Sequence, residues 1–418
     1  MCYHARSQEA SSESRMCCEG QMNRRGSQGD HAPPTPVWLD GEECLDKDRY
    51  LSGKRILPKG LTGTEELPDL IDNVLLAYNG ARLREGCELF VRKMLADNVT
   101  VGMSLSGALT PAGLGVSCIV PLIKAGFVDW IIATGANLYH DLHFALDCPL
   151  HVGLPCVDDA ALRRNDVVRI YDVFLSYTDV LQVTDRFLQQ TLAQPEFQRE
   201  MGSAELHHLL GRHAAEQERR NGLADVSILA AAYRAGLPVY TSAPGDSAIG
   251  MEIAAARIRK SKLRISSAID VNETAGLVLE AKRSGGKSAV MIMGGGTPKN
   301  FMLQTELQIQ EVLRLPELGH DYFFQVTDAR PDTGGLSGAT PQEAVSWGKV
   351  DPAGLSDAVA CRADVTIALP VLTHYALARH AQRALKRLYE GRGNAVKLLI
   401  DEYCQNNPRW SHLRPKGP

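Results

Sequence analysis

A lysine close to an indole and a carboxylate is the first chemically suggestive group in this 418-residue sequence. Trp347 and Lys349 end the segment 339–349, and Glu343 lies one helical turn before the tryptophan. Burial lowers the pKa of a lysine and exposes its neutral, nucleophilic amine. An indole face and a carboxylate can both hold a cationic substrate. The segment therefore predicts covalent amine chemistry at Lys349.

The same segment also fits an ordinary helix start. Thr340 can act as the N-cap, Pro341 suits the first helical position and Glu343 suits the third. Short motifs are shared by many unrelated proteins, so this segment alone does not separate the two interpretations.

Three loops of small residues follow apolar, strand-like runs. Glycine lets a phosphate approach the backbone, and the N-terminus of a following helix offers free N–H groups. None of the loops has the GxGxxG pattern, and a tight strand-to-helix turn is the alternative for each. Together at one edge of a sheet they would suit a dinucleotide. The loops are Ser106-Gly107-Ala108, Thr134-Gly135-Ala136-Asn137 and Gly294-Gly295-Gly296-Thr297-Pro298.

Four further residues are candidates for binding. Asp246 and Asp364 could hold ribose hydroxyls, although an aspartate between strand and helix more often caps the helix. Tyr139 and His140 follow the Thr134 loop, with His143 one turn later. Two histidines alone do not make a zinc site, so substrate binding by Tyr139 or His140 is favoured over metal binding. The alternative is that they are ordinary helix residues, and no metal is expected.

Composition is that of a globular protein, with 44% hydrophobic and 22% charged residues and a net charge of −4. The sequence has no basic block of the kind that binds a nucleic acid or a membrane surface. Its apolar runs are far shorter than the ~18 residues of a membrane span. The ten cysteines include no CxxC pair, so we expect neither a zinc site nor a disulfide framework. Dispersed thiols predict a reduced, cytoplasmic location.

Short apolar runs alternate with helical patterns through the body of the chain. Runs apolar on both faces are typical of buried parallel strands, and we expect them at 99–105, 128–133, 238–241, 289–293, 322–326 and 365–369. Helices are expected at 110–125, 157–194, 203–219, 247–260, 272–284, 298–315, 341–349 and 373–391. The alternation predicts one large α/β domain with a doubly wound, mostly parallel sheet. We place it at 38–404, between a disordered tail at 1–37 and a loosely ordered tail at 405–418.

These motifs resemble deoxyhypusine synthase. The resemblance rests on VSWGK at 345–349, Glu343 before it, the Gly294 turn, Asp246 within PGDSAIG, and Asp364 ahead of an apolar run and Pro370. Their order and spacing match over roughly residues 50 to 390. The TGANLYHD form of the Thr134 loop is similar to a divergent branch called deoxyhypusine synthase-like proteins.

The resemblance implies a Rossmann-like fold, a homotetramer, bound NAD and transfer of an aminobutyl group from a polyamine. Lys349 matches the lysine that forms the imine, and Trp347 and Glu343 match positions that contact the substrate. NAD contacts are implied for Ser106, Thr134, Gly135, Ala136, Asp246, Gly294, Gly295, Ala329 and Asp364.

Several polyamine-binding positions depart from the family pattern. Tyr139 and His140 replace paired glutamates, and Asn300 replaces a histidine. Leu336 and Met251 each replace an aspartate, with Glu252 next to the latter. Each desolvated ammonium of a polyamine needs a partner, so the loss of carboxylates predicts a shorter or less charged amine.

The leading hypothesis is an NAD-dependent transferase that passes an aminoalkyl group to a small amine, with a homospermidine-like or an aminopropyl-agmatine-like product. The second is authentic deoxyhypusine synthase, which modifies one lysine of a translation factor; a protein acceptor is disfavoured by the substituted acids. A third is a non-catalytic regulatory paralogue, which would have no need of Lys349. A fourth is a plain NAD dehydrogenase, which would release NADH.

Overall fold

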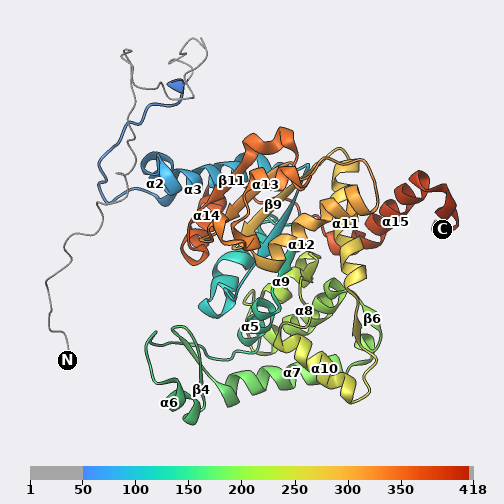
Figure 1. The fold of residues 1–418 in the computed structure, drawn as a ribbon. Coiled ribbons are helices and arrows are strands. Elements are labelled where there is room, and N and C mark those ends of the chain that lie inside the picture. The colour runs from blue at the N-terminus through green and yellow to red at the C-terminus, as the bar shows by residue number, and fades with distance from the viewer. Residues whose placement is uncertain (1–49, 414–418) are drawn as a thin grey trace, which may run out of the picture. The chain divides into compact units, whose positions relative to one another are not determined.

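A six-stranded parallel sheet forms the centre of the protein (Figure 1). The computed structural model describes residues 50–413, so the predicted tail 1–37 lies outside the described residues. The chain divides into a unit ending at Ile56 and a second beginning at Leu57, and the fold below is that of the second. In sheet order, its strands are β11 (Ala358–Cys361), β10 (Tyr322–Val326), β9 (Lys287–Met293), β1 (Val99–Leu105), β2 (Trp130–Ala133) and β7 (Val239–Thr241).

The strand order defines the fold class. Counted along the chain, the six strands run 6-5-4-1-2-3 across the sheet, and each neighbouring pair is parallel. This is the order of the Rossmann fold, in which the direction of winding reverses between strands 1 and 4. Here the reversal lies between β1 and β9. The predicted doubly wound α/β fold is confirmed.

Side chains of alternate strand residues enter two separate cores. Along β9, Met291 faces one core and Val290 the other. The first core includes residues of α3 (Tyr78–Leu89), α9 (Ile228–Ala235) and α14 (Val365–Arg379). The second includes residues of α11 (Ser267–Arg283), α12 (Gly296–Leu307) and α15 (Leu388–Asn406). In Figure 1, α3 and α14 lie on one side of β9 and α11 and α15 on the other, so helices cover both faces of the sheet.

Close packing within the sheet requires one particular glycine. Gly102 in β1 pairs with Trp130 in β2, and the indole is fully buried. A Cβ at position 102 would lie 2.5 Å from the indole carbon Cε2. Glycine is therefore needed where the strand meets the largest side chain of the second core.

The remaining helices surround these two cores. They are α2 (Leu67–Val74), α4 (Val120–Lys124), α5 (Gly135–Ala145), α6 (Asp159–Arg164), α7 (Gln182–Leu192), α8 (Ser203–Arg220), α10 (Ala248–Ile258) and α13 (Pro341–Ser346). Two small sheets complete the described part of the chain. They are β3 (His151–Val152), β5 (Val173–Ser176) and β4 (Val167–Ile170) in one, and β6 (Glu200–Met201) with β8 (Arg264–Ile265) in the other.

The strand predicted at 365–369 is wrong, because these residues begin α14. Asp364 caps the helix by accepting a hydrogen bond from the backbone N–H of Thr366 at 2.6 Å. Buried residues in α14 recur with helical spacing, at Leu369, Leu372 and Ala376. The β-branched residues at the start of the segment looked like a strand, but the helix cap and the spacing of the buried residues favour a helix. The sixth strand is β11, just before it.

The single helix predicted at 157–194 is also wrong. A hairpin of β4 and β5 separates α6 from α7. Ile170 pairs with Val173, so the turn consists of Tyr171 and Asp172 alone, and Tyr171 has a left-handed φ of 54°. Two-residue turns with positive φ match the twist of a hairpin.

The helix predicted at 373–391 divides into α14 and α15, separated by residues 380–387. Arg383 in this connection is 9% exposed and donates to Asp129 Oδ2 at 3.0 Å. A buried arginine bonded to the sheet holds the connection extended. Residues 405–413, expected to be loosely ordered, continue α15 to Asn406 and then form a 3₁₀ helix.

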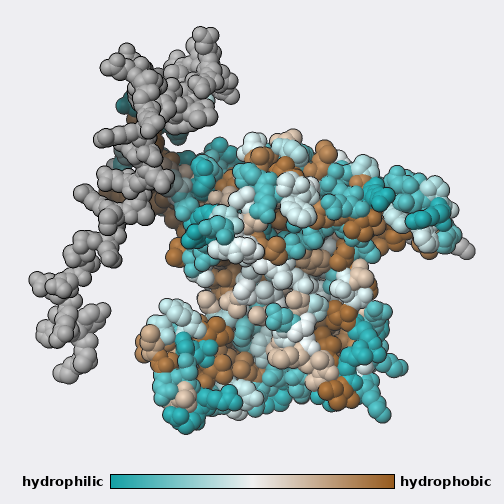
Figure 2. All heavy atoms as spheres, in the orientation of Figure 1, coloured by the Kyte–Doolittle hydropathy of each residue, from teal (hydrophilic) through white to brown (hydrophobic). Residues whose placement is uncertain are grey.

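Apolar side chains gather at the surface near β4 and α6, on the face drawn in Figure 2. Val152 in β3 is 96% exposed and Leu154 is 63% exposed. Exposed apolar patches are typical of protein interaction sites. Within residues 50–413, no helix is both long and apolar enough to cross a bilayer.

Candidate active site

The loops after β1 and β9 meet at the point where the sheet reverses its winding. Ser106 Oγ accepts a hydrogen bond from Gly295 N at 3.0 Å and donates to Gly295 O. Thr134, after β2, donates from Oγ1 to Gly107 O at 2.6 Å. Parallel strands end on the same edge, and ligands of such sheets bind there. The structure therefore brings the three predicted small-residue loops together.

Backbone groups at this edge are open to a ligand. Gly107 has a left-handed φ of 64°, and a Cβ there would have no atom within 4 Å. Gly294 is also left-handed, with φ 85°. Gly295, the N-cap of α12, has no side chain of its own to cap the helix, and Ser337 Oγ accepts from Gly296 N at 2.8 Å in its place. These features fit the phosphates of a dinucleotide.

The two predicted ribose aspartates differ in their hydrogen bonds. Within residues 50–413, the exposed carboxylate of Asp246 has no hydrogen-bond partner. Asp364 instead uses Oδ1 to accept from both the N–H and the hydroxyl of Thr366, each at 2.6 Å. These bonds lower the pKa of the Asp364 carboxyl. Asp364 thus has the capping role that was its alternative, while Asp246 remains free to bind hydroxyls.

Other predicted cofactor residues lie in the same region. A Cβ at Gly135 would be 2.3 Å from the Cβ of Ser247, so the start of α5 packs directly against the Asp246 loop. Ala136 follows in the first turn of α5. The carbonyl of Ala329, after β10, accepts from Arg362 Nη1 at 2.6 Å. Every predicted cofactor residue therefore lies beyond the carboxyl end of a strand.

Lys349 lies in a separate cavity of about 270 Å³ between α12 and α13. Its Nζ is 3.3 Å from Asn300 Oδ1 and 5.6 Å from the centroid of the Trp347 ring. Burial lowers the pKa of Lys349, although the charges of Glu343 and Glu311 act against this. A lowered pKa gives a larger share of neutral amine at neutral pH. Four of the six residues predicted for catalysis or substrate binding (Asn300, Glu343, Trp347 and Lys349) line this one cavity.

The local fold explains how Lys349 is presented. Thr340 Oγ1 accepts from Glu343 N at 3.2 Å, so the predicted helix start is real. The helix ends at Ser346, and the left-handed φ of 71° at Gly348 lets Lys349 N donate back to Ala344 O at 2.9 Å. The two interpretations of this segment coexist, because the capped helix is what positions the lysine.

A second lysine in the cavity wall is missed by the sequence analysis. Lys299 is 3% exposed, and its Nζ donates to Gln325 Oε1 at 2.9 Å and to Ala339 O at 2.7 Å. Burial lowers its pKa to about 8; Glu343 opposes this shift and Lys349 adds to it. Its place directly after the Gly294 loop was visible in sequence, but its burial was not.

Tyr139 and His140 are not among the residues that line the Lys349 cavity. Tyr139 is 5% exposed, and its hydroxyl donates to Asp185 Oδ1 at 2.7 Å. His140 Nδ1 is 3.0 Å from His143 Nε2, and burial lowers the pKa of His140 to about 4. A buried tyrosine and a neutral histidine thus stand at the two α5 positions where the resemblance places paired glutamates.

The predicted cofactor residues and the Lys349 cavity form two groups within one chain. None of the predicted cofactor residues lines the cavity. Ser337 connects the groups, since its Oγ accepts from Gly296 N at 2.8 Å and its carbonyl accepts from Gln325. Among the described residues that line the cavity, Glu343 is the one carboxylate. No cluster suited to a metal ion occurs within residues 50–413.

Comparisons with known proteins agree with this arrangement. Residues 69–376 match the family model for deoxyhypusine synthase. A "Deoxyhypusine synthase-like protein" of Thermosynechococcus vestitus is 56% identical over 353 residues, which cover 84% of this chain and 88% of that protein. A "Probable deoxyhypusine synthase 2" of Methanosarcina acetivorans is 38% identical over 312 residues, which cover 73% of this chain and 85% of that protein.

A solved structure supports the fold alone. The crystal structure of an Entamoeba histolytica protein described as a deoxyhypusine synthase has a TM-score of 0.50 and 12% identity. The match covers 79% of this chain and all of that one. With the strand order, the lysine cavity and the family match in agreement, this chain belongs to the deoxyhypusine synthase family.

Proposed function

We propose that this chain is an NAD-dependent transferase that moves an aminobutyl-type group from a polyamine to an acceptor amine through an imine on Lys349. The supporting observation is the lowered pKa of Lys349, whose amine faces a cavity between Asn300 and Trp347. An imine forms only from an unprotonated amine. The family to which the chain belongs is one of transferases, which agrees with net transfer.

The side chains around Lys349 have separate roles in this proposal. Glu343 pairs with an ammonium of the donor, and the Trp347 ring supports the cationic chain. Asn300 Oδ1 accepts a hydrogen bond from Nζ and so keeps the lysine directed into the cavity. These residues hold the donor; Lys349 alone makes the covalent bond.

The strand-end loops would hold NAD. Backbone groups near Gly107, Gly294 and Gly295 would contact its phosphates, and Asp246 would bind a ribose. When bound, NAD would supply reversible hydride acceptance, which would keep the overall transfer redox neutral. A plain dehydrogenase would not need Lys349.

The acceptor in this proposal is a small amine, giving a homospermidine-like product. Glu343 is the one carboxylate in the described lining, and Leu336 is apolar. A site with few anions favours a second amine of low charge beside the donor. Authentic deoxyhypusine synthase activity on a protein lysine is the alternative, and it shares the same chemistry at Lys349.

Product analysis tests the proposal. Purified protein is incubated with NAD and labelled spermidine, with either putrescine or the translation-factor precursor as acceptor. Labelled small amine by mass spectrometry is expected, together with a borohydride-trapped adduct on Lys349. Transfer to the protein alone would favour deoxyhypusine synthase, and net release of NADH would favour a dehydrogenase. Activity only after mixing with a paralogue would favour a regulatory role.

The proposal includes a homotetramer acting in the cytoplasm, with no nucleic acid or membrane partner. The exposed apolar side chains Val152 and Leu154 support self-association. Light scattering coupled to size exclusion measures the oligomer, and a monomeric active enzyme would refute this part.

A further inference from the structure

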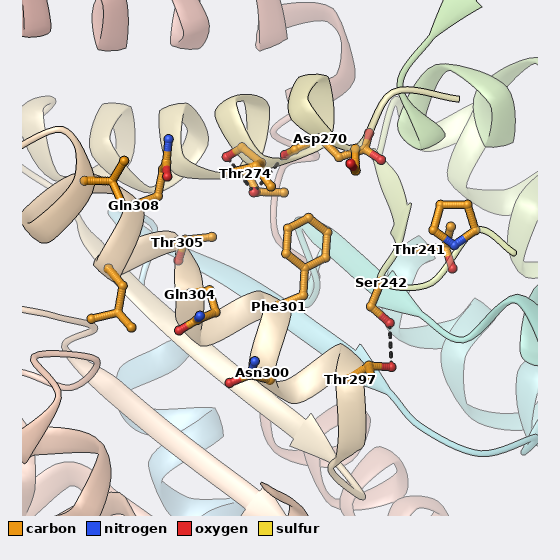
Figure 3. Close-up of a pocket in the computed structure, with 15 residues that line it drawn as sticks. Thr241, Ser242, Asp270, Thr274, Thr297, Asn300, Phe301, Gln304, Thr305 and Gln308 are labelled. Atoms are coloured by element: carbon orange, nitrogen blue, oxygen red, sulfur yellow. Dashed lines mark hydrogen bonds between the residues drawn. The ribbon is translucent and has the colours of Figure 1, made fainter. Parts of the chain in front are cut away.

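A second, larger cavity of about 400 Å³ lies beside α12. Figure 3 shows it between α11 and α12, with Phe301 projecting from α12 toward α11. Asn300, Gln304 and Leu307 line both this cavity and the one with Lys349. Their spacing of four and then three residues places them on one ridge of the helix. The two cavities are therefore neighbours across that ridge.

Two residues that line the larger cavity each carry a buried polar atom without a hydrogen-bond partner. They are Oδ2 of Asp270 and Oγ1 of Thr241, in residues that are 1% and 5% exposed. Ser203 holds both residues: its N–H donates to Asp270 Oδ1 at 2.7 Å, and its Oγ accepts from Thr241 N at 3.0 Å. Buried polar atoms are nearly always paired, so this pair of vacant acceptors calls for a donor.

The chemistry of the lining points to a cation with an alkyl chain. Burial raises the pKa of Asp270 to about 7, and a neighbouring positive charge would restore its carboxylate. An ammonium supplies three donors, enough for both vacant atoms. Val271, Phe301 and Val312 add apolar surface along the cavity, which suits methylene groups.

We infer that this cavity binds the acceptor as a linear diamine, with its distal ammonium on Asp270 and Thr241 and its near amine directed past Asn300 to Lys349. The inference rests on the proposed function, since it assumes an imine on Lys349. It deepens that function by giving donor and acceptor separate cavities. Asn300, which lines both and contacts Nζ, lies where the two substrates meet.

The step that joins the cavities is balanced without an oxidant or reductant. The neutral near amine of the acceptor adds to the carbon of the protonated imine on Lys349 and forms a C–N bond. A proton moves from the acceptor nitrogen to Lys349 Nζ, the bond from carbon to Nζ breaks, and Lys349 leaves as a neutral amine. The double bond now joins the carbon to the acceptor nitrogen, and the product is again a protonated imine. The distal ammonium takes no part, so its pairing with Asp270 affects binding alone.

Asp270→Asn tests the inference while preserving the hydrogen bond from Ser203. The holoenzyme is loaded with NAD and spermidine and then given diamines or monoamines of equal chain length. We expect the KM for the diamine to rise at least tenfold and the preference over the monoamine to disappear. The borohydride-trapped fraction of Lys349, measured before acceptor is added, should stay unchanged. Thr241→Val should raise the same KM by a smaller factor.

Asp141→Asn is the matched control, because Asp141 is also 1% exposed but its carboxylate accepts from Ser227 Oγ and Ile228 N, both at 2.6 Å. It should lower the Tm and leave the acceptor KM unaltered, whereas Asp270→Asn should not lower the Tm. An unchanged diamine KM in Asp270→Asn overturns the inference, whatever happens to the Tm. Absence of any trapped Lys349 adduct in the wild type would instead refute the proposed function.

Discussion

The strand-end loops and the Lys349 cavity are built in different ways. The loops consist largely of backbone, with glycines at Gly107 and Gly294 in left-handed conformations. The cavity is made of side chains from α12 and α13, which lie some forty residues apart in sequence. Backbone sites depend on the fold and tolerate few changes, whereas a side-chain site can change its substrate one residue at a time. This difference explains how cofactor residues can match the family while amine-binding residues depart from it.

The largest expected effect is at the cavity. Lys349→Ala should reduce transfer by more than about 10⁴-fold, as loss of other covalent catalysts does. Lys349→Arg should fail equally, because arginine stays protonated and cannot form an imine. Both variants should bind NAD as the wild type does by calorimetry, since no predicted cofactor residue lines the cavity. Full transfer in either variant would show that the mechanism is not covalent.

The sequence predicts the strand-end loops better than the side chains around Lys349. Five strands and their glycine loops could be found because apolar runs and glycines are local signals. The strand predicted at 365–369 was wrong, since a β-branched run after Asp364 looked like a strand until the cap and the helical burial were known. Lys299 was missed because its burial depends on Gln325 and Ala339, two partners remote in sequence. Side-chain contacts between distant segments leave no local pattern.

Asp246 and Asp364 test which carboxylate at the edge of the sheet binds NAD. Asp246→Ala should weaken NAD binding by about 10- to 100-fold, the effect of one lost hydrogen bond to a charged group. Asp364→Ala should weaken it less, because Oδ1 already caps α14, and should lower the free energy of unfolding by about 1 kcal/mol. Calorimetry and urea unfolding measure the two quantities. Equal losses of NAD affinity would mean that both carboxylates serve the cofactor.

Lys299→Met tests whether the cavity depends on its hidden lysine. The change leaves Gln325 Oε1 and Ala339 O without their donor and loosens the loop before α13. We expect adduct formation to slow by about tenfold, the cost of one or two unpaired buried groups. The pKa of Lys349 is set by burial, Glu343 and Glu311, so the acid limb of the rate profile should stay in place. A rate of adduct formation equal to that of the wild type would show that the cavity does not depend on Lys299.

Glu343→Gln should have the smallest effect on the rate of adduct formation. Glu343 favours the ammonium form of Lys349, so its charge raises a pKa that burial lowers. Removing that charge should lower the pKa of Lys349 further. More neutral amine is then present at low pH, and the acid limb of single-turnover adduct formation moves to lower pH by less than about one unit, because the cavity is partly open to solvent. The KM for the donor should rise at the same time, since the one carboxylate in the described cavity lining is lost. A shift of the acid limb to higher pH would mean that Glu343 acts on the proton of Lys349 directly and does not merely set the charge around it.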